Sequence, residues 1–221
     1  AGVPRGVVSI VPGKGSVIGD AIVKHPLVKK VSFTGGTTTG RALAKLAAEK
    51  LMPVTLELGG KSPTIVCEDA DLDHAVNGVI YGIFSSSGES CIAGSRLFVH
   101  ESVRTAFLER LVAKTNALRV GDPEDVRTQM GPLITAKHRG SIERYVQLGL
   151  DEGGKLLAGG ERPKGGLYDR GWFYRPTILD RLSNTTRIEQ EEIFGPVLVA
   201  LSYRDEDDLL CQANDSVFGL A

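Results

Sequence analysis

The chain has 221 residues, and its 26 basic and 27 acidic residues leave a formal charge of −1. This balance, with no block of like charge, argues against a nucleic-acid groove or an anionic membrane surface as partner. No apolar run approaches the roughly 20 residues that span a bilayer, and three scattered cysteines are too few for a disulfide framework. We therefore expect a soluble, cytoplasmic protein with reduced thiols.

The first third of the chain alternates predicted strands and helices. Strands are expected at residues 7–11, 30–33 and 54–58, because these are apolar runs bounded by proline or glycine. A short helix through Ile18 and Val23 should end before Pro26, and a second should run from about Thr38 to Lys50. Strands and helices in this alternation predict right-handed crossovers and a parallel sheet.

The alternation restarts after the Gly59-Gly60 pair. Strands are expected at residues 64–67, 96–100 and 197–203, and helices from Leu72 to Ile83 and over residues 205–213. Two further helices should be capped by Ser102 and Thr135. The sequence therefore predicts an α/β fold in two domains, residues 1–59 and 60–221.

Cys91 lies in the run G-E-S-C-I-A-G-S-R, residues 88–96, between a predicted helix and a predicted strand. Small residues and glycines let the backbone approach a substrate and leave amides available for an oxyanion. A thiolate at this position would be a competent nucleophile. Cys67 and Cys211 lie in apolar settings and are interpreted as small hydrophobic residues.

Glu57 interrupts an apolar strand in the run T-L-E-L-G-G-K-S-P, residues 55–63. A carboxylate buried between Leu56 and Leu58 would be desolvated and could act as a base near neutral pH. The simpler alternative is a glutamate at a strand end that reaches solvent or a lysine.

Together these two runs resemble the signatures of the NAD(P)-dependent aldehyde dehydrogenase superfamily. The glutamate and cysteine are 91 − 57 = 34 positions apart, as in that family. F-T-G-G-T-T-T-G at residues 33–40 is similar to the family's cofactor loop, and E-E-I-F-G-P-V at residues 191–197 to a further motif. The resemblance extends from Val7 to Ala221. It implies the second half of a Rossmann-like cofactor domain at residues 1–59, followed by an α/β catalytic domain that lacks its C-terminal end.

The resemblance implies oxidation of an aldehyde to a carboxylic acid through covalent catalysis. Cys91 would attack the aldehyde to form a thiohemiacetal, which becomes a thioester after hydride transfer, and Glu57 would activate the water that hydrolyses it. The Cys91 backbone N–H would supply half of the oxyanion hole. NAD or NADP is the implied cofactor, and the choice between them stays open. The implied cofactor-binding residues are Gly35, Gly36, Thr37, Gly40, Leu58, Glu192 and Phe194.

Two positions depart from the family pattern. Glu89 replaces the usual Gln, and a carboxylate so near the cysteine would oppose its thiolate unless it is paired or points away. Gly36 stands where many members carry Ser. Family members are also more than twice this long, so we expect an internal piece of a homodimeric or homotetrameric enzyme, itself weakly active or inactive.

Two other functions remain as alternatives. A CoA-acylating member of the superfamily is disfavoured by Glu57, a base that such members generally lack. A non-catalytic binding or structural role is the other alternative: the joint presence of Cys91 and Glu57 counts against a retired family member, whereas an inactive fragment stays open because the chain is short. A metal site is not expected, because the four histidines share no ligand spacing with one another or with the cysteines.

Overall fold

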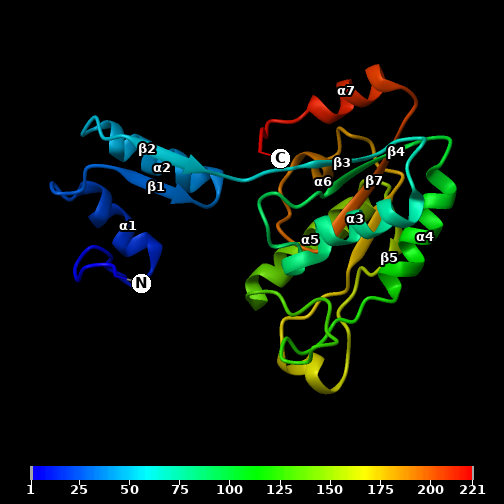
Figure 1. The fold of residues 1–221 in the computed structure, drawn as a ribbon, viewed down its shortest axis with the longest axis horizontal. Coiled ribbons are helices and arrows are strands. Elements are labelled where there is room, and N and C mark those ends of the chain that lie inside the picture. The colour runs from blue at the N-terminus through cyan, green and yellow to red at the C-terminus, as the bar shows by residue number, and fades with distance from the viewer. Residues whose placement is uncertain (1, 221) are drawn as a thin grey trace. The chain divides into compact units, whose positions relative to one another are not determined.

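A computed structural model describes residues 2–220, and the chain divides into two compact units, Ala1–Gly59 and Gly60–Ala221 (Figure 1). Each unit has its own sheet and its own hydrophobic core. The assignment of the first unit to cofactor binding and of the second to catalysis stays a prediction.

The first unit is a small α/β layer. Strand β1 (Val31–Thr34) pairs in parallel with β2 (Val54–Glu57), with Val31 opposite Val54. Helices α1 (Gly15–Lys24) and α2 (Thr37–Ala48) contribute Val23 and Ala47 to the core of this unit. The crossover from β1 through α2 to β2 matches the predicted alternation.

The predicted strand at residues 7–11 is wrong, because this segment is irregular. Its apolar side chains Val7, Val8, Ile10 and Val11 are between 63% and 89% exposed. The sheet of this unit consists of β1 and β2 within the described residues. An apolar run without a neighbouring strand has no ladder to join, so its composition alone does not make it a strand.

The second unit is built around a five-stranded sheet in the order β3-β4-β7-β6-β5. β5 is antiparallel to β6, and every other pair is parallel, which confirms the predicted α/β class. The strands are β3 (Pro63–Val66), β4 (Arg96–His100), β5 (Lys155–Ala158), β6 (Thr177–Asp180) and β7 (Val197–Tyr203). The helices are α3 (Leu72–Phe84), η1 (Ser85–Gly88), α4 (Arg104–Asn116), α5 (Ala136–Asp151), η2 (Gly166–Arg170), α6 (Arg187–Gln190) and α7 (Glu206–Asn214).

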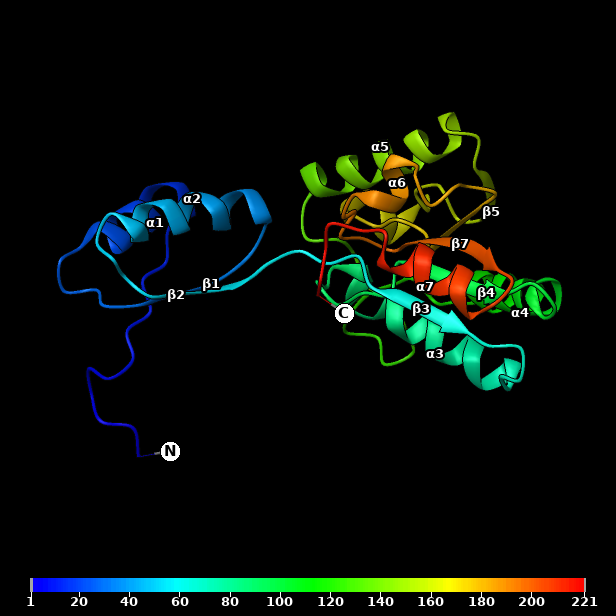
Figure 2. The ribbon, with the colours of Figure 1, turned by 90° about the horizontal axis from the view of Figure 1, so that it is seen from above.

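Helices cover both faces of this sheet, as Figure 2 shows for α3 on one side and α5 and α6 on the other. Successive side chains of a strand point to opposite faces, so β4 contributes to two cores. Leu97 and Val99 join the core formed with α3 and α4, whereas Phe98 joins Leu209 of α7. Burial on both faces explains why β4 and β7 are nearly continuous apolar runs.

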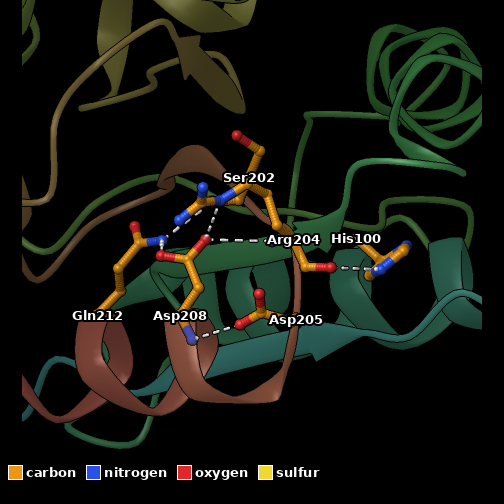
Figure 3. A network of polar contacts seen from close by, with 6 residues as sticks. All are labelled: His100, Ser202, Arg204, Asp205, Asp208 and Gln212. Carbon is orange, nitrogen blue, oxygen red and sulfur yellow. Dashed lines mark hydrogen bonds and ion pairs between the residues drawn. The ribbon is translucent and has the colours of Figure 1, made fainter.

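A polar network fixes the turn from β7 into α7 (Figure 3). The Asp205 carboxylate caps α7 by accepting from the Asp208 amide at 2.9 Å, and the Asp208 carboxylate accepts from the Arg204 amide at 3.1 Å. The first bond satisfies an amide at the start of the helix that has no partner inside it, and the second ties the residue before the cap to the first turn. His100 Nε2, at the end of β4, lies 3.0 Å from the Arg204 carbonyl oxygen.

Of the two predicted helix caps, one is confirmed and one is wrong. Thr135 caps α5 by accepting from the His138 amide at 3.1 Å. Ser102 does not cap α4, because that helix begins after Val103 and the Ser102 hydroxyl instead pairs with His100 Nδ1 at 2.7 Å. Residues 2–220 contain no helix with the length and apolar character needed to cross a membrane.

Candidate active site

The segment that carries Cys91, residues 85–95, is named the nucleophile loop. Three consecutive residues near its start lie in the left-handed backbone region, at φ values of 51° for Ser86, 57° for Ser87 and 70° for Gly88. Only glycine adopts this conformation without a steric cost, so Ser86 and Ser87 are held there by their surroundings. Ser87 is buried, and its hydroxyl donates to the Gly131 carbonyl at 3.2 Å.

Cys91 is a partly buried free thiol that follows this turn. The Ala93 amide donates to the Ser90 carbonyl at 3.2 Å, which folds the chain tightly around the cysteine. Within residues 2–220, the Cys91 amide N–H has no hydrogen-bond acceptor. A thiol and a free amide on the same residue are what covalent attack on a carbonyl and stabilisation of the resulting oxyanion require.

Gly60 joins the nucleophile loop to the 191–197 segment. Its amide donates to Glu192 Oε1 at 3.1 Å, and a Cβ at this position would lie 2.3 Å from the Cys91 carbonyl oxygen. A side chain on residue 60 would therefore displace the backbone of the cysteine. The neighbouring Glu191 has different partners, since Arg187 Nε donates to it at 2.8 Å and the Tyr145 hydroxyl at 2.9 Å.

Glu89, which departs from the family pattern, is paired. Its Oε1 accepts from the Ile134 amide at 3.1 Å and lies 3.5 Å from His138 Nε2. The Glu89 side chain is 16% exposed; Ile134 directly precedes the Thr135 cap of α5, and His138 lies in the first turn of that helix. The carboxylate is thus paired with groups other than the Cys91 thiol, which is the condition under which it would not oppose the thiolate.

Phe194 has φ +57°, again in the left-handed region, and is 38% exposed. Its carbonyl oxygen lies 2.6 Å from His138 Nε2. A small cavity of about 10 Å³ lies between the nucleophile loop and the 191–197 segment. Its lining residues are Gly60, Ile83, Gly88, Ser90, Ala93, Ser95, Glu192, Ile193, Phe194 and Gly195.

The remaining predicted residues lie together in the first unit. The Gly35 amide donates to the Glu57 carbonyl at 3.0 Å, which links the predicted cofactor loop to the end of β2. Gly36 precedes Thr37, the first residue of α2, and no side chain caps the helix. A Cβ on Gly40 would lie 2.5 Å from Leu58 Cδ2, so Leu58 covers the first turn of α2.

The desolvation expected for Glu57 is not observed in this unit. The β2 residues alternate between partly buried and exposed, and Glu57 is exposed while Leu56 and Leu58 are partly buried. Glu57 was predicted to be desolvated on a buried strand, but the described helices of the unit pack on one face of a two-stranded sheet, and Glu57 lies on the exposed face.

Sequence reasoning gave no role to a buried charged cluster next to Gly60. Lys61, Arg96 and Glu189 are each at most 2% exposed. Burial lowers the pKa of Lys61 to about 8 and raises that of Glu189 to about 7, and the opposite charges of the two residues limit both shifts. Arg96 links Lys61 to α7, since its Nε donates to the Lys61 carbonyl at 3.0 Å and its Nη2 to the Ala213 carbonyl at 2.8 Å. Glu189 was missed because a lone glutamate in a short helical turn looks like a surface residue.

The profile of the Aldehyde dehydrogenase family matches residues 1–221. The chain belongs to this family. It is 48% identical over its whole length to a betaine aldehyde dehydrogenase of Brucella ovis, of which it covers 45%. This aldehyde dehydrogenase chain therefore spans about half the length of the relatives that it matches.

Solved structures of aldehyde dehydrogenases have the same fold. The betaine aldehyde dehydrogenase of Staphylococcus aureus, solved with NAD+, superposes with a TM-score of 0.95 at 38% identity, over 99% of this chain and 43% of that one. An aldehyde dehydrogenase of Bacillus cereus in complex with NAD+ gives a TM-score of 0.94 at 42% identity, over 99% of this chain and 44% of that one. These likenesses confirm the predicted fold class and the family resemblance.

Proposed function

We propose that this aldehyde dehydrogenase chain carries the nucleophile, the base and part of the cofactor site of an enzyme that oxidises an aldehyde to a carboxylic acid with NAD or NADP. The main support is the position of Gly60, whose amide donates to Glu192 and whose Cα lies against the Cys91 carbonyl. The predicted nucleophile and a predicted cofactor carboxylate are thus joined at one backbone position.

The proposed chemistry starts at Cys91. Its thiolate attacks the aldehyde carbon, and its amide N–H, which has no acceptor within residues 2–220, donates to the oxyanion of the thiohemiacetal. Loss of hydride leaves a thioester on Cys91. Glu57 then takes a proton from the water that hydrolyses the thioester, and the acid is released from a regenerated thiol.

The residues present fit the proposed cofactor. The first turn of α2 has no side-chain cap, and the space that a Cβ on Gly36 would enter holds no atom within 4 Å. An uncapped helix N-terminus with room in front of it suits a phosphate, so Gly35, Gly36, Thr37 and Gly40 would hold the pyrophosphate. Leu58, Glu192 and Phe194 would hold the nicotinamide riboside. When bound, the nicotinamide ring supplies the hydride acceptor.

The proposed substrate is a small aldehyde. Betaine aldehyde is the first candidate, because relatives at 48% identity are named for it. We also propose that the intact enzyme is a homodimer or homotetramer in the cytoplasm, and that the 221-residue chain alone turns over weakly or not at all.

Alkylation by iodoacetamide near pH 7, followed by peptide mass spectrometry, tests the nucleophile. Cys67 and Cys211 are exposed whereas Cys91 is partly buried, so accessibility alone predicts that Cys91 reacts last. An activated Cys91 should instead react at least about 10-fold faster than the other two, and NAD should change its rate alone. Labelling of Cys91 no faster than Cys67 would overturn the proposal.

The E57Q variant separates the base from the nucleophile. Because the base acts after the acyl group is formed, E57Q should leave the alkylation rate of Cys91 within roughly 2-fold of wild type, while in the intact enzyme the same substitution should remove steady-state NADH production from an aldehyde. Acyl-CoA formation on addition of CoA would instead favour the acylating branch. Binding of NAD without any NADH formed would favour an inactive fragment.

A further inference from the structure

The left-handed backbone of Phe194 needs an explanation, because a residue with a side chain at φ +57° is strained. Such strain persists only where surrounding contacts hold the residue in place. The neighbouring Gly195 approaches Gly88 so closely that a Cβ on Gly88 would lie 2.3 Å from the Gly195 carbonyl oxygen. The conformation of the 191–197 segment is therefore coupled to that of the nucleophile loop.

His138 provides the contact that holds Phe194. Its Nε2 lies 2.6 Å from the Phe194 carbonyl oxygen, so this nitrogen carries the proton and donates it. The imidazole also meets the Phe194 ring edge-on, with 6.1 Å between the ring centroids. The donor is well placed, because Thr135 caps α5 by accepting from the His138 amide and so fixes the first turn of the helix.

Glu89 links this contact to the nucleophile loop. Its carboxylate lies 3.5 Å from His138 Nε2 and accepts from the Ile134 amide at 3.1 Å. A negative charge beside Nε2 favours the tautomer that carries its proton on this nitrogen, which is the donor that Phe194 uses. A glutamine at residue 89 could still accept from Ile134 but would bring no charge to the imidazole.

We propose that Glu89 and His138 form a positioning pair, which holds the strained Phe194 backbone and locks the 191–197 segment to the nucleophile loop. The pair also keeps the Glu89 carboxylate engaged away from the Cys91 thiol. Neither residue touches the reacting atoms. The inference deepens the proposed function and rests on it for the roles of Cys91 and Phe194, while the pairing itself concerns only contacts within the second unit.

Two matched substitutions at residue 138 test the pair by hydrogen–deuterium exchange of the peptide that covers residues 190–197. H138Q can keep an N–H donor near Phe194, whereas the shorter amide of H138N cannot reach it. We expect H138N to raise the exchange rate of this peptide by about 10-fold, as for the loss of one hydrogen bond, and H138Q to stay within about 2-fold of wild type. Equal exchange in both variants and wild type would overturn the proposal.

The alkylation rate of Cys91 gives a second readout, which a purely structural role would not reproduce. H138N should slow alkylation by roughly 3-fold or more because it releases the Glu89 carboxylate, and E89Q added to H138N should restore the rate. If the double variant stays as slow as H138N, the electrostatic part of the proposal is wrong. If Cys91 of the wild-type chain fails to react selectively, the proposed function fails, and the exchange experiment still decides the positioning role.

Discussion

Gly88 and Gly195 lie backbone to backbone: a Cβ on Gly88 would come within 2.3 Å of both the carbonyl carbon and the carbonyl oxygen of Gly195. Gly88 also has φ +70°. G88A should therefore combine backbone strain with a steric collision and lower the free energy of unfolding by about 2–5 kcal/mol. Urea unfolding followed by the fluorescence of Trp172, the only tryptophan, measures this in the second unit.

G78A is the matched control for G88A. Gly78 lies inside α3, and a Cβ there would meet no atom within 4 Å. The same substitution should stabilise the helix by about 0.5–1 kcal/mol, because alanine loses less backbone entropy than glycine. Equal effects of the two substitutions would mean that the contact with Gly195 is not as tight as the structure has it.

G60A tests the junction between Glu192 and Cys91. The new Cβ would lie 2.3 Å from the Cys91 carbonyl oxygen and 3.2 Å from the Leu220 carbonyl oxygen, both of which are backbone atoms that must shift. We expect a loss of about 1–3 kcal/mol in stability and a fall of roughly 5-fold or more in the alkylation rate of Cys91. G82A, whose Cβ would meet nothing within 4 Å in α3, should leave that rate unchanged.

The buried Glu189 predicts a pH dependence of stability. Burial raises its pKa from 4.5 to about 7, so between these values the native state keeps a proton that the unfolded chain has lost. The free energy of unfolding should therefore fall as the pH rises from 4.5 to 7, by at most about 3 kcal/mol from this group.

Lys61 affects the free energy of unfolding over a different range of pH. Its pKa is lowered from 10.5 to about 8, so between pH 8 and 10.5 the unfolded chain binds more protons and stability should rise with pH.

The E189Q variant tests the contribution of Glu189. Its side chain resembles the protonated carboxyl, so it should flatten the pH dependence of stability between pH 4.5 and 7 relative to wild type. E109Q, which changes an exposed glutamate of α4, is the control. If the unfolding midpoint changes by the same amount between pH 5 and pH 7 in wild type and in E189Q, this account is contradicted.

Local pattern was sufficient for most elements. β4 and β7 were predicted with the bounds that the structure has, because both are apolar runs long enough to be buried on two faces. β5 and β6 were not predicted, since β5 begins with the charged Lys155 and β6 ends in the charged Asp180, which leaves each with a short apolar run. The run at residues 7–11 was predicted as a strand and is irregular, because a strand needs a neighbour that its own sequence does not provide.

The sequence by itself determined the family, the α/β class and the candidate nucleophile, because the motifs around Glu57 and Cys91 are local and ordered along the chain. Only the tertiary structure decided that Gly60 contacts both Glu192 and Cys91, that His138 pairs Glu89 with Phe194, and that Glu189 is buried. Each of these depends on segments far apart in the chain that fold against one another. Periodicity and motif spacing describe neighbours along the chain, whereas burial, charge pairing and backbone contact depend on neighbours in space.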